Sequence, residues 1–236
     1  RFFSRAKIVP GFAGVMVKSE LQAARFRMLG IDRVAITGEM RFDQPIPQAH
    51  IAAARTFRTA AMGARPVITM ASMVVGEDVS ALDMIAQVQS QFVQRGLEKP
   101  LFIYVPRAPE RFDVVAEIIA EKSLSYAKRS DVLDALLQIK SETGNAETDI
   151  AKIDINGLDI VLGDSLGEMY FYLTMADNVV AGGGFTPHGA HNVIEPLALK
   201  KPVIVGPYIH TIEYPAVEAI AAGVCTHVHS ELELAN

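Results

Sequence analysis

Short runs of β-branched and aromatic residues alternate with helical patterns along most of the 236-residue chain. The strand-like runs include "RPVITMAS", "PLFIYVP" and "KPVIVGP", and each is followed by a segment with helical character. The run at 100–106 is apolar at consecutive positions, which is typical of a strand buried on both faces. The alternation predicts an α/β fold: a doubly wound, Rossmann-like parallel sheet with helices on both faces.

The start of the chain has its own βαβ pattern. "GVMVKS" predicts a strand, "SELQAARFRMLG" predicts a helix that is capped by Ser19 and Gln22 and ends at Gly30, and "RVAITG" predicts a second strand. A polar joint containing two prolines, "DQPIPQ", follows. We therefore expect a boundary after residue 42, with residues 43–236 forming the larger domain.

Two segments of the larger domain have distinct patterns. The helix expected after "RPVITMAS" ends at Gly96. Its expected buried face consists of Leu82, Ile85, Ala86, Phe92 and Val93. Residues 129–157 are polar with one possible helix, so we expect an insertion there.

Composition limits the function classes. The net charge of −5 argues against a general nucleic-acid binder, because affinity for the phosphate backbone comes from clustered Lys and Arg. The first 41 residues nevertheless carry eight basic and three acidic side chains, which suits either a solvated face or contact with an anionic lipid or acceptor.

No leader-like segment or apolar run of about 20 residues occurs, so we expect no membrane crossing by this stretch. One cysteine, Cys225, gives weak support for a reducing compartment.

The segment "GGGFTPHGAHNVIEP", residues 182–196, combines three consecutive glycines with a helix expected at Asn192–Leu199. A glycine-rich turn before a helix allows backbone N–H groups to approach an anion, and the helix dipole favours negative charge at the same place. We therefore expect exposed amides around Gly182–Gly184 that bind a phosphate.

Polar side chains follow the other expected strands and leave alternatives open. Arg107, directly after the buried run, could bind a phosphate or base carbonyl, or could pair with Glu110. Glu168, in "GDSLGEM", could line the same site or only complement a helix dipole. Glu195 lies three residues after Asn192, so it could complete a capping box or accept hydrogen bonds from a ribose diol.

Other common sites have little support in the sequence. His188 and His191, like His227 and His229, are closely spaced, but no carboxylate or thiol cluster completes a metal site. The sequence also lacks a Gly-x-x-x-x-Gly-Lys phosphate loop, a strand-linked Gly-x-Gly-x-x-Gly motif and a Gly-x-Ser-x-Gly elbow. These absences argue against the commonest NTPase, dehydrogenase and hydrolase classes.

An ordered set of motifs resembles one enzyme family over nearly the whole chain. The segments "KSELQAARFRMLG", "VAITGEMRFD", "YVPRAPERFDVV", "VLGDSLGEMYFYLTMAD" and "VVAGGGFTPHGAHNVIEPLALKKPVIVGPYIHT" are similar to the carboxyl-terminal half of the Kdo transferases. These bacterial enzymes add 3-deoxy-D-manno-octulosonic acid (Kdo) to a lipid A precursor. The resemblance implies a GT-B glycosyltransferase whose second Rossmann-like domain, here 43–236, binds the donor CMP-Kdo.

The resemblance also implies which residues bind the nucleotide. They are Pro106, Arg107, Leu166, Gly167, Glu168, Met169, Gly183, Gly184, His191, Asn192, Val193, Ile194 and Glu195. No metal or other cofactor is implied. Two alternative functions stay open: a non-catalytic nucleotide-binding relative, and a UDP-sugar transferase or epimerase of the same architecture.

The same resemblance implies what lies outside this stretch of sequence. Residues 1–42 would be the end of an acceptor-binding domain and its linker, and the general base would belong to the rest of that domain. We therefore expect the chain to bind nucleotide but not to catalyse transfer alone. The full-length enzyme would act at the cytoplasmic face of the bacterial inner membrane, with membrane contact made elsewhere, and this piece would be soluble.

The chain departs from the family pattern at three places near the expected site. Ala108 follows the Pro-Arg pair where the family usually has His. Ser72, Met73 and Val74 stand where the family has a Thr-His or similar pair, and Gly184 and Ala190 replace Ser and Gly in the glycine-rich loop. Side-chain donors near the phosphate are therefore fewer than the family pattern provides.

Overall fold

A computed structural model describes residues 8, 11–132, 155–230 and 233–234. The chain divides into two compact units, Arg1–Pro45 (unit 1) and Ile46–Asn236 (unit 2), which we describe separately. The origin of unit 1 in an acceptor-binding domain stays a prediction. Among the described residues, no helix is long and apolar enough to cross a bilayer.

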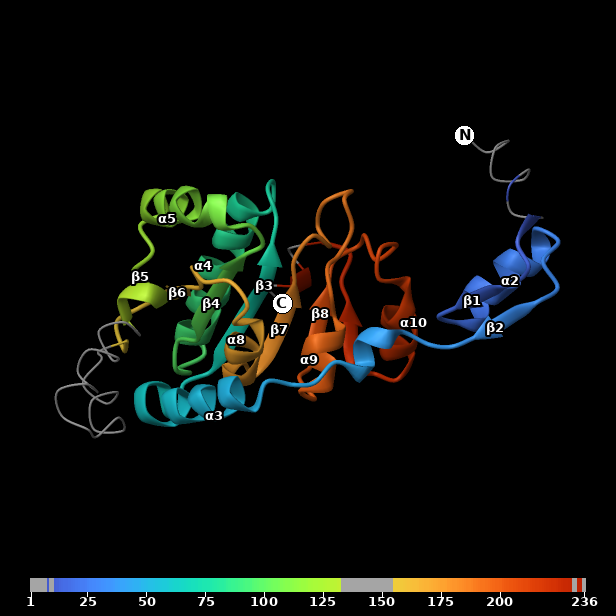
Figure 1. Cartoon of the computed structure of the whole chain (residues 1–236). Helices are drawn as coiled ribbons and strands as arrows, with labels where there is room; N and C mark the ends of the chain where they lie inside the picture. The colour runs from blue at the N-terminus through green and yellow to red at the C-terminus, as the bar shows by residue number, and fades with distance from the viewer. Residues whose placement is uncertain (1–7, 9–10, 133–154, 231–232, 235–236) are drawn as a thin grey trace. The chain divides into compact units, whose positions relative to one another are not determined.

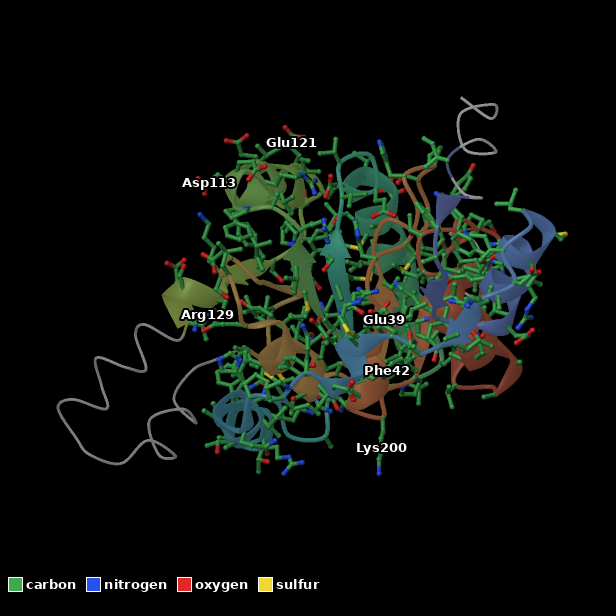
Figure 2. All side chains as sticks on the ribbon, turned by 45° about the vertical axis from the view of Figure 1, so that its right-hand side comes forward. Glu39, Phe42, Asp113, Glu121, Arg129 and Lys200 are labelled. Carbon is green, nitrogen blue, oxygen red and sulfur yellow. The ribbon has the colours of Figure 1, made fainter. Side chains whose placement is uncertain are left out.

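Unit 1 is a small βαβ arrangement. It consists of β1 (Val15–Val17), α2 (Glu20–Met28) and β2 (Val34–Ile36), and the two strands are parallel. The side-chain oxygen of Ser19 accepts a hydrogen bond from the Gln22 N–H, and Gly30 has the positive φ that a helix end favours. Glu39, labelled in Figure 2, forms ion pairs with Lys18 and Arg41.

Unit 2 is built on a parallel sheet of seven strands in the order β5-β6-β4-β3-β7-β8-β9 (Figure 1). β4 is buried at every position, as its continuous apolar run predicts. The strands are β3 (Val67–Met73), β4 (Leu101–Pro106), β5 (Tyr126–Lys128), β6 (Ile160–Leu162), β7 (Asn178–Ala181), β8 (Val203–Val205) and β9 (Cys225–His227).

Helices cover both faces of this sheet. Residues of α4 and α5 pack with one face of β3, β4 and β6, and residues of α3 and α8 pack with the other face of the same strands. The predicted doubly wound, Rossmann-like fold is confirmed. The helices of unit 2 are α3 (Gln48–Phe57), α4 (Asp78–Gln94), α5 (Phe112–Glu121), α8 (Met169–Met175), α9 (Ile194–Ala198) and α10 (Glu213–Ala221).

The sheet has a topological switch point between β3 and β7. After β3 the chain forms β4, β5 and β6 on one side of β3, and it then crosses to form β7, β8 and β9 on the other side. Ligands of open parallel sheets bind beyond the carboxyl ends of strands at such a point. We therefore expect a ligand site at the loops that follow β3 and β7.

Two details differ from the sequence expectations. Ala86 and Val93 were predicted to be buried, but both lie on the exposed side of α4. The buried stripe instead contains Ala81, Met84 and Val88 with Leu82 and Ile85. Ala86 and Val93 are apolar, but they lie outside the stripe of positions that a 3.6-residue period places on the buried face of the helix. Of the expected insertion at 129–157, residues 133–154 lie outside the described part of the chain.

Candidate functional site

Backbone contacts bring three loops together at the carboxyl edge of the sheet. The Arg107 N–H donates to the Met73 oxygen at 2.9 Å, so the loop after β4 lies against the end of β3. On the other side of β3, the Gly182 N–H donates to the Ala71 oxygen at 2.8 Å. Arg107 and the glycine-rich loop therefore flank the end of β3. The last residues of this strand include Ser72, whose φ of 60° is uncommon for a residue with a side chain.

The glycines of the loop are required by packing between backbones. A Cβ atom on Gly182 would lie 2.4 Å from the Ser72 carbonyl oxygen, and one on Gly184 would lie 2.8 Å from the Gly206 nitrogen. A side chain at either position would therefore force the backbone to move. Gly182 and Gly184 thus allow the loop to pass close to the ends of β3 and β8.

A buried glutamate, Glu77, occupies the amides that the sequence suggested would bind phosphate. Its carboxylate accepts hydrogen bonds from the N–H groups of Gly183 at 2.7 Å and Phe185 at 3.0 Å. The side chain is only 1% exposed. The expectation of exposed amides around Gly182–Gly184 is therefore wrong, because an anion from the protein itself already satisfies the Gly183 amide and Ala71 satisfies that of Gly182.

Arg107 and His191 provide the positive and polar groups of this edge. Arg107 is exposed, and it forms no ion pair with Glu110, although both residues are described. The His191 ring lies against the loop, since a Cβ on Gly183 would be 3.0 Å from its Cδ2 atom. Burial, and to a smaller extent the nearby Arg107 charge, together lower the pKa of His191 to about 4. The imidazole is therefore neutral at pH 7.

The lowered pKa of His191 predicts a pH dependence of stability. The ring titrates at about 4 in the folded protein and at 6.5 when it is free of the fold. The unfolded state thus binds the proton more tightly, so this contribution is complete above pH 6.5 and is lost as the pH falls through 4. We expect a loss of about 1 kcal/mol, after allowance for solvent screening of a half-buried ring.

Urea unfolding at several pH values between 4 and 7 gives the free energy of unfolding as a function of pH. The difference in this pH dependence between the wild type and His191→Gln measures the contribution of the ring. His188→Gln controls for removal of an imidazole from an exposed position of the same loop. The same pH dependence of the unfolding free energy in the wild type and His191→Gln would contradict the lowered pKa of His191.

Glu168 belongs to a polar cluster beside the ends of β5 and β6. Its carboxylate pairs with Arg129, labelled in Figure 2, and accepts a hydrogen bond from the Ser165 hydroxyl. It makes no side-chain capping bond to α8. The simple helix-dipole explanation is therefore incomplete. Leu166, at 70% exposed, and Gly167, with a φ of 77°, form the tip of this loop.

The start of α9 differs from the expected capping box. The helix begins at Ile194 instead of Asn192 and has only five residues. The side-chain oxygen of Asn192 accepts from the Ile194 N–H at 2.9 Å, which makes a local turn, and the helix start has no side-chain capping bond. With so short a helix, the dipole argument for phosphate binding carries little weight.

The remaining residues that were predicted to bind the nucleotide differ in what they can contact. Val193 and Ile194 are buried at 0% and 2% exposed, so only their backbone could meet a ligand. Glu195 is half-buried and lies near Tyr170: burial raises the pKa of Tyr170 and the Glu195 charge raises it further. Pro106 is buried at the end of β4, and Met169 is the first residue of α8.

Three buried charged residues that shape this edge were not identified from the sequence. Glu77 immediately precedes α4 and Asp78 is its first residue, and both are buried. Asp78 accepts from the Tyr104 hydroxyl at 2.8 Å and pairs with Arg111, whose other nitrogen donates to the Met73 oxygen. Groups of three or more side chains suited to a metal ion do not occur among the described residues.

Comparison with known proteins gives consistent matches. No family model matches the chain. A 3-deoxy-D-manno-octulosonic acid transferase of Bordetella pertussis is 33% identical over 213 residues, which cover 90% of this chain and 45% of that protein. The corresponding transferase of Haemophilus influenzae is 28% identical over 86% of this chain and 42% of that protein. The chain thus spans less than half the length of these curated relatives.

A solved structure matches the fold. The C-terminal CMP-Kdo binding domain of WaaA from Acinetobacter baumannii superposes with a TM-score of 0.64 and 26% identity. The match covers 80% of this chain and 86% of that one. The sequence relatives and the structural match thus agree: the chain is similar in sequence and in its Rossmann-like fold to the carboxyl-terminal half of the 3-deoxy-D-manno-octulosonic acid transferases.

Proposed function

We propose that this chain is the donor-binding part of a glycosyltransferase that moves Kdo from CMP-Kdo to a lipid A precursor in lipopolysaccharide synthesis. The observation that carries the proposal is the placement of Arg107 and the 182–192 loop on either side of the β3 end, at the switch point of a fold shared with a CMP-Kdo binding domain. Ligands of this fold class bind at that point.

The proposed roles follow from the chemistry of each side chain. Arg107 is a permanently charged donor that suits the phosphate of CMP, and it would stabilise the charge that develops there as the sugar leaves. His191 presents a buried Nε2 atom without a protein partner among the described residues, so a ligand oxygen could supply one. The carboxylate of Glu195 is suited to accept hydrogen bonds from ribose hydroxyls. These roles need no metal ion.

Removal of the Arg107 side chain should weaken CMP binding strongly. We expect Arg107→Ala to raise the Kd for CMP about 10- to 100-fold, because a charge-assisted hydrogen bond contributes about 1.5–3 kcal/mol. The melting temperature should change little, since this side chain is exposed. Isothermal calorimetry measures the Kd. The matched control is Arg95→Ala, which removes an exposed arginine at the carboxyl-terminal end of α4. This variant should bind CMP as the wild type does.

Two other functions make different predictions for the same calorimetry. A UDP-sugar transferase or epimerase of this architecture would prefer UDP-sugars to CMP. A non-catalytic interaction protein that kept the fold and lost the nucleotide site would bind none of these nucleotides. Preference for CMP over UMP and UDP-sugars supports the proposed donor and contradicts a UDP-sugar enzyme and an interaction protein without a nucleotide site.

We propose further that the donor site alone does not catalyse transfer, because the general base and the acceptor-binding surface would belong to a preceding domain. In the full-length enzyme that domain would bring the site to the cytoplasmic face of the inner membrane. Incubation of the chain with CMP-Kdo and a lipid acceptor tests this part. Product formation by the chain alone would contradict it.

A further inference from the structure

Glu77 joins two loops that are far apart in the sequence. One carboxylate oxygen, Oε2, accepts from the N–H groups of Val74 at 3.2 Å and Gly183 at 2.7 Å. The other, Oε1, accepts from the Phe185 N–H at 3.0 Å. Val74 belongs to the loop after β3, and Gly183 and Phe185 belong to the loop after β7. Glu77 therefore ties these loops together at the switch point of the sheet.

The geometry of this contact resembles an anion site that is already filled. Consecutive backbone N–H groups in a glycine-rich loop commonly hold a phosphate or carboxylate. Here Glu77 is 1% exposed, and its carboxylate accepts from three backbone N–H groups, of which those of Gly183 and Phe185 belong to the glycine-rich loop. A ligand phosphate thus cannot use the Gly183 and Phe185 amides without displacing Glu77, so it must rely on other donors of the same edge.

We propose that Glu77 is a positioning residue of the donor site, which rests on the function proposed above. By fixing the amides of Gly183 and Phe185, it sets the course of the loop against which the His191 ring packs. The same carboxylate holds Val74, just beyond the β3 end that receives the Arg107 N–H. Glu77 thereby fixes the distance between Arg107 and His191 without touching the ligand itself.

A glutamine at this position should disturb the loop and keep the volume. Among the described residues, each hydrogen bond that the Glu77 carboxylate accepts comes from a backbone N–H group. Whichever way the amide of Glu77→Gln is turned, its NH₂ group faces at least one of these donors, so at least one hydrogen bond is lost. The substitution therefore tests the carboxylate itself, separately from packing.

The matched control is a buried polar residue of α4, the helix that begins directly after Glu77. Gln89 is 4% exposed and donates to the oxygens of Pro100 and Asp159, which precede β4 and β6 at the opposite edge of the sheet. Gln89→Ala should lower the melting temperature and leave the loop after β7 as it is. A purely structural role for Glu77 would make the two variants behave alike.

The experiment combines amide hydrogen exchange with CMP calorimetry at a temperature where all three proteins are folded. For Glu77→Gln we expect the Gly183 and Phe185 amides to exchange at least about tenfold faster while the Ile103 amide in β4 stays protected. The Kd for CMP should rise about tenfold. Gln89→Ala should keep wild-type exchange at Gly183 and Phe185 and bind CMP within about twofold of the wild type.

Three outcomes are decisive. Wild-type CMP affinity and wild-type exchange at Gly183 and Phe185 in Glu77→Gln would overturn the proposal. Equal losses of affinity in Glu77→Gln and Gln89→Ala would overturn it too, because the effect would then be one of general stability. If the wild type itself fails to bind CMP, the proposed function is contradicted, and the exchange rates still decide whether Glu77 holds the loop.

Discussion

Replacement of Asp78 by alanine should lower the free energy of unfolding by about 3–5 kcal/mol, because it leaves a buried charge without its partner. Arg111 is 8% exposed, and Asp78 is the carboxylate that it pairs with. The substitution also removes the acceptor of the fully buried Tyr104 hydroxyl. Two polar groups would then stay in the core with fewer hydrogen bonds, and each adds to the loss.

Urea unfolding with a double-mutant cycle measures this effect. Asp113→Ala is the matched control, because Asp113, labelled in Figure 2, lies in the first turn of α5 as Asp78 lies in that of α4. Unlike Asp78, it is exposed, and it pairs with Lys128. We expect the control to change stability by about 0.5 kcal/mol or less. The double variant Asp78→Leu with Arg111→Met should lose less than Asp78→Ala. A loss below about 1 kcal/mol for Asp78→Ala would contradict a buried ion pair.

The second large effect is expected at Gly182. A Cβ atom there would lie 2.4 Å from the Ser72 oxygen and 2.7 Å from the Met73 Cα atom. Both are backbone atoms at the end of β3, so the strand or the loop must move to accept Gly182→Ala. We expect a loss of about 2–4 kcal/mol in the free energy of unfolding.

Gly157→Ala provides the comparison, because a Cβ at this exposed turn position meets nothing within 4 Å. It should change the unfolding free energy by about 0.5 kcal/mol or less. If Gly182→Ala proves as mild as Gly157→Ala, the close approach of β3 and the loop after β7 is wrong.

The fold could be predicted from local patterns because its strands are buried on both faces. The apolar run of β4 and the small, β-branched run of β3 both predicted strands correctly, and the alternation with helices predicted the parallel sheet. The boundary of α9 could not be predicted as well. Asn192 has the right side chain for a cap, but it forms a local turn, and the helix starts two residues later.

The arrangement at the carboxyl edge of the sheet could be predicted less well, as Glu77 illustrates. The glycine-rich loop and Arg107 follow strands of one parallel sheet and flank the end of β3, and their roles in nucleotide binding stay predictions. The occupant of the loop amides was missed, since Glu77 precedes Gly183 by 106 positions and only the tertiary fold brings them together. A buried carboxylate and a solvated one look alike in sequence.

The central claim is that a cytidine nucleotide binds at the carboxyl edge between β4, β3 and β7. Titration of the isotope-labelled chain with CMP, followed by the amide signals in NMR spectra, tests it most directly. The account predicts that signals of Arg107 and of residues 183–192 move, while those of Lys99 and Leu101 at the opposite edge stay in place. Shifts gathered at the opposite edge, or an unchanged spectrum at millimolar CMP, would contradict it.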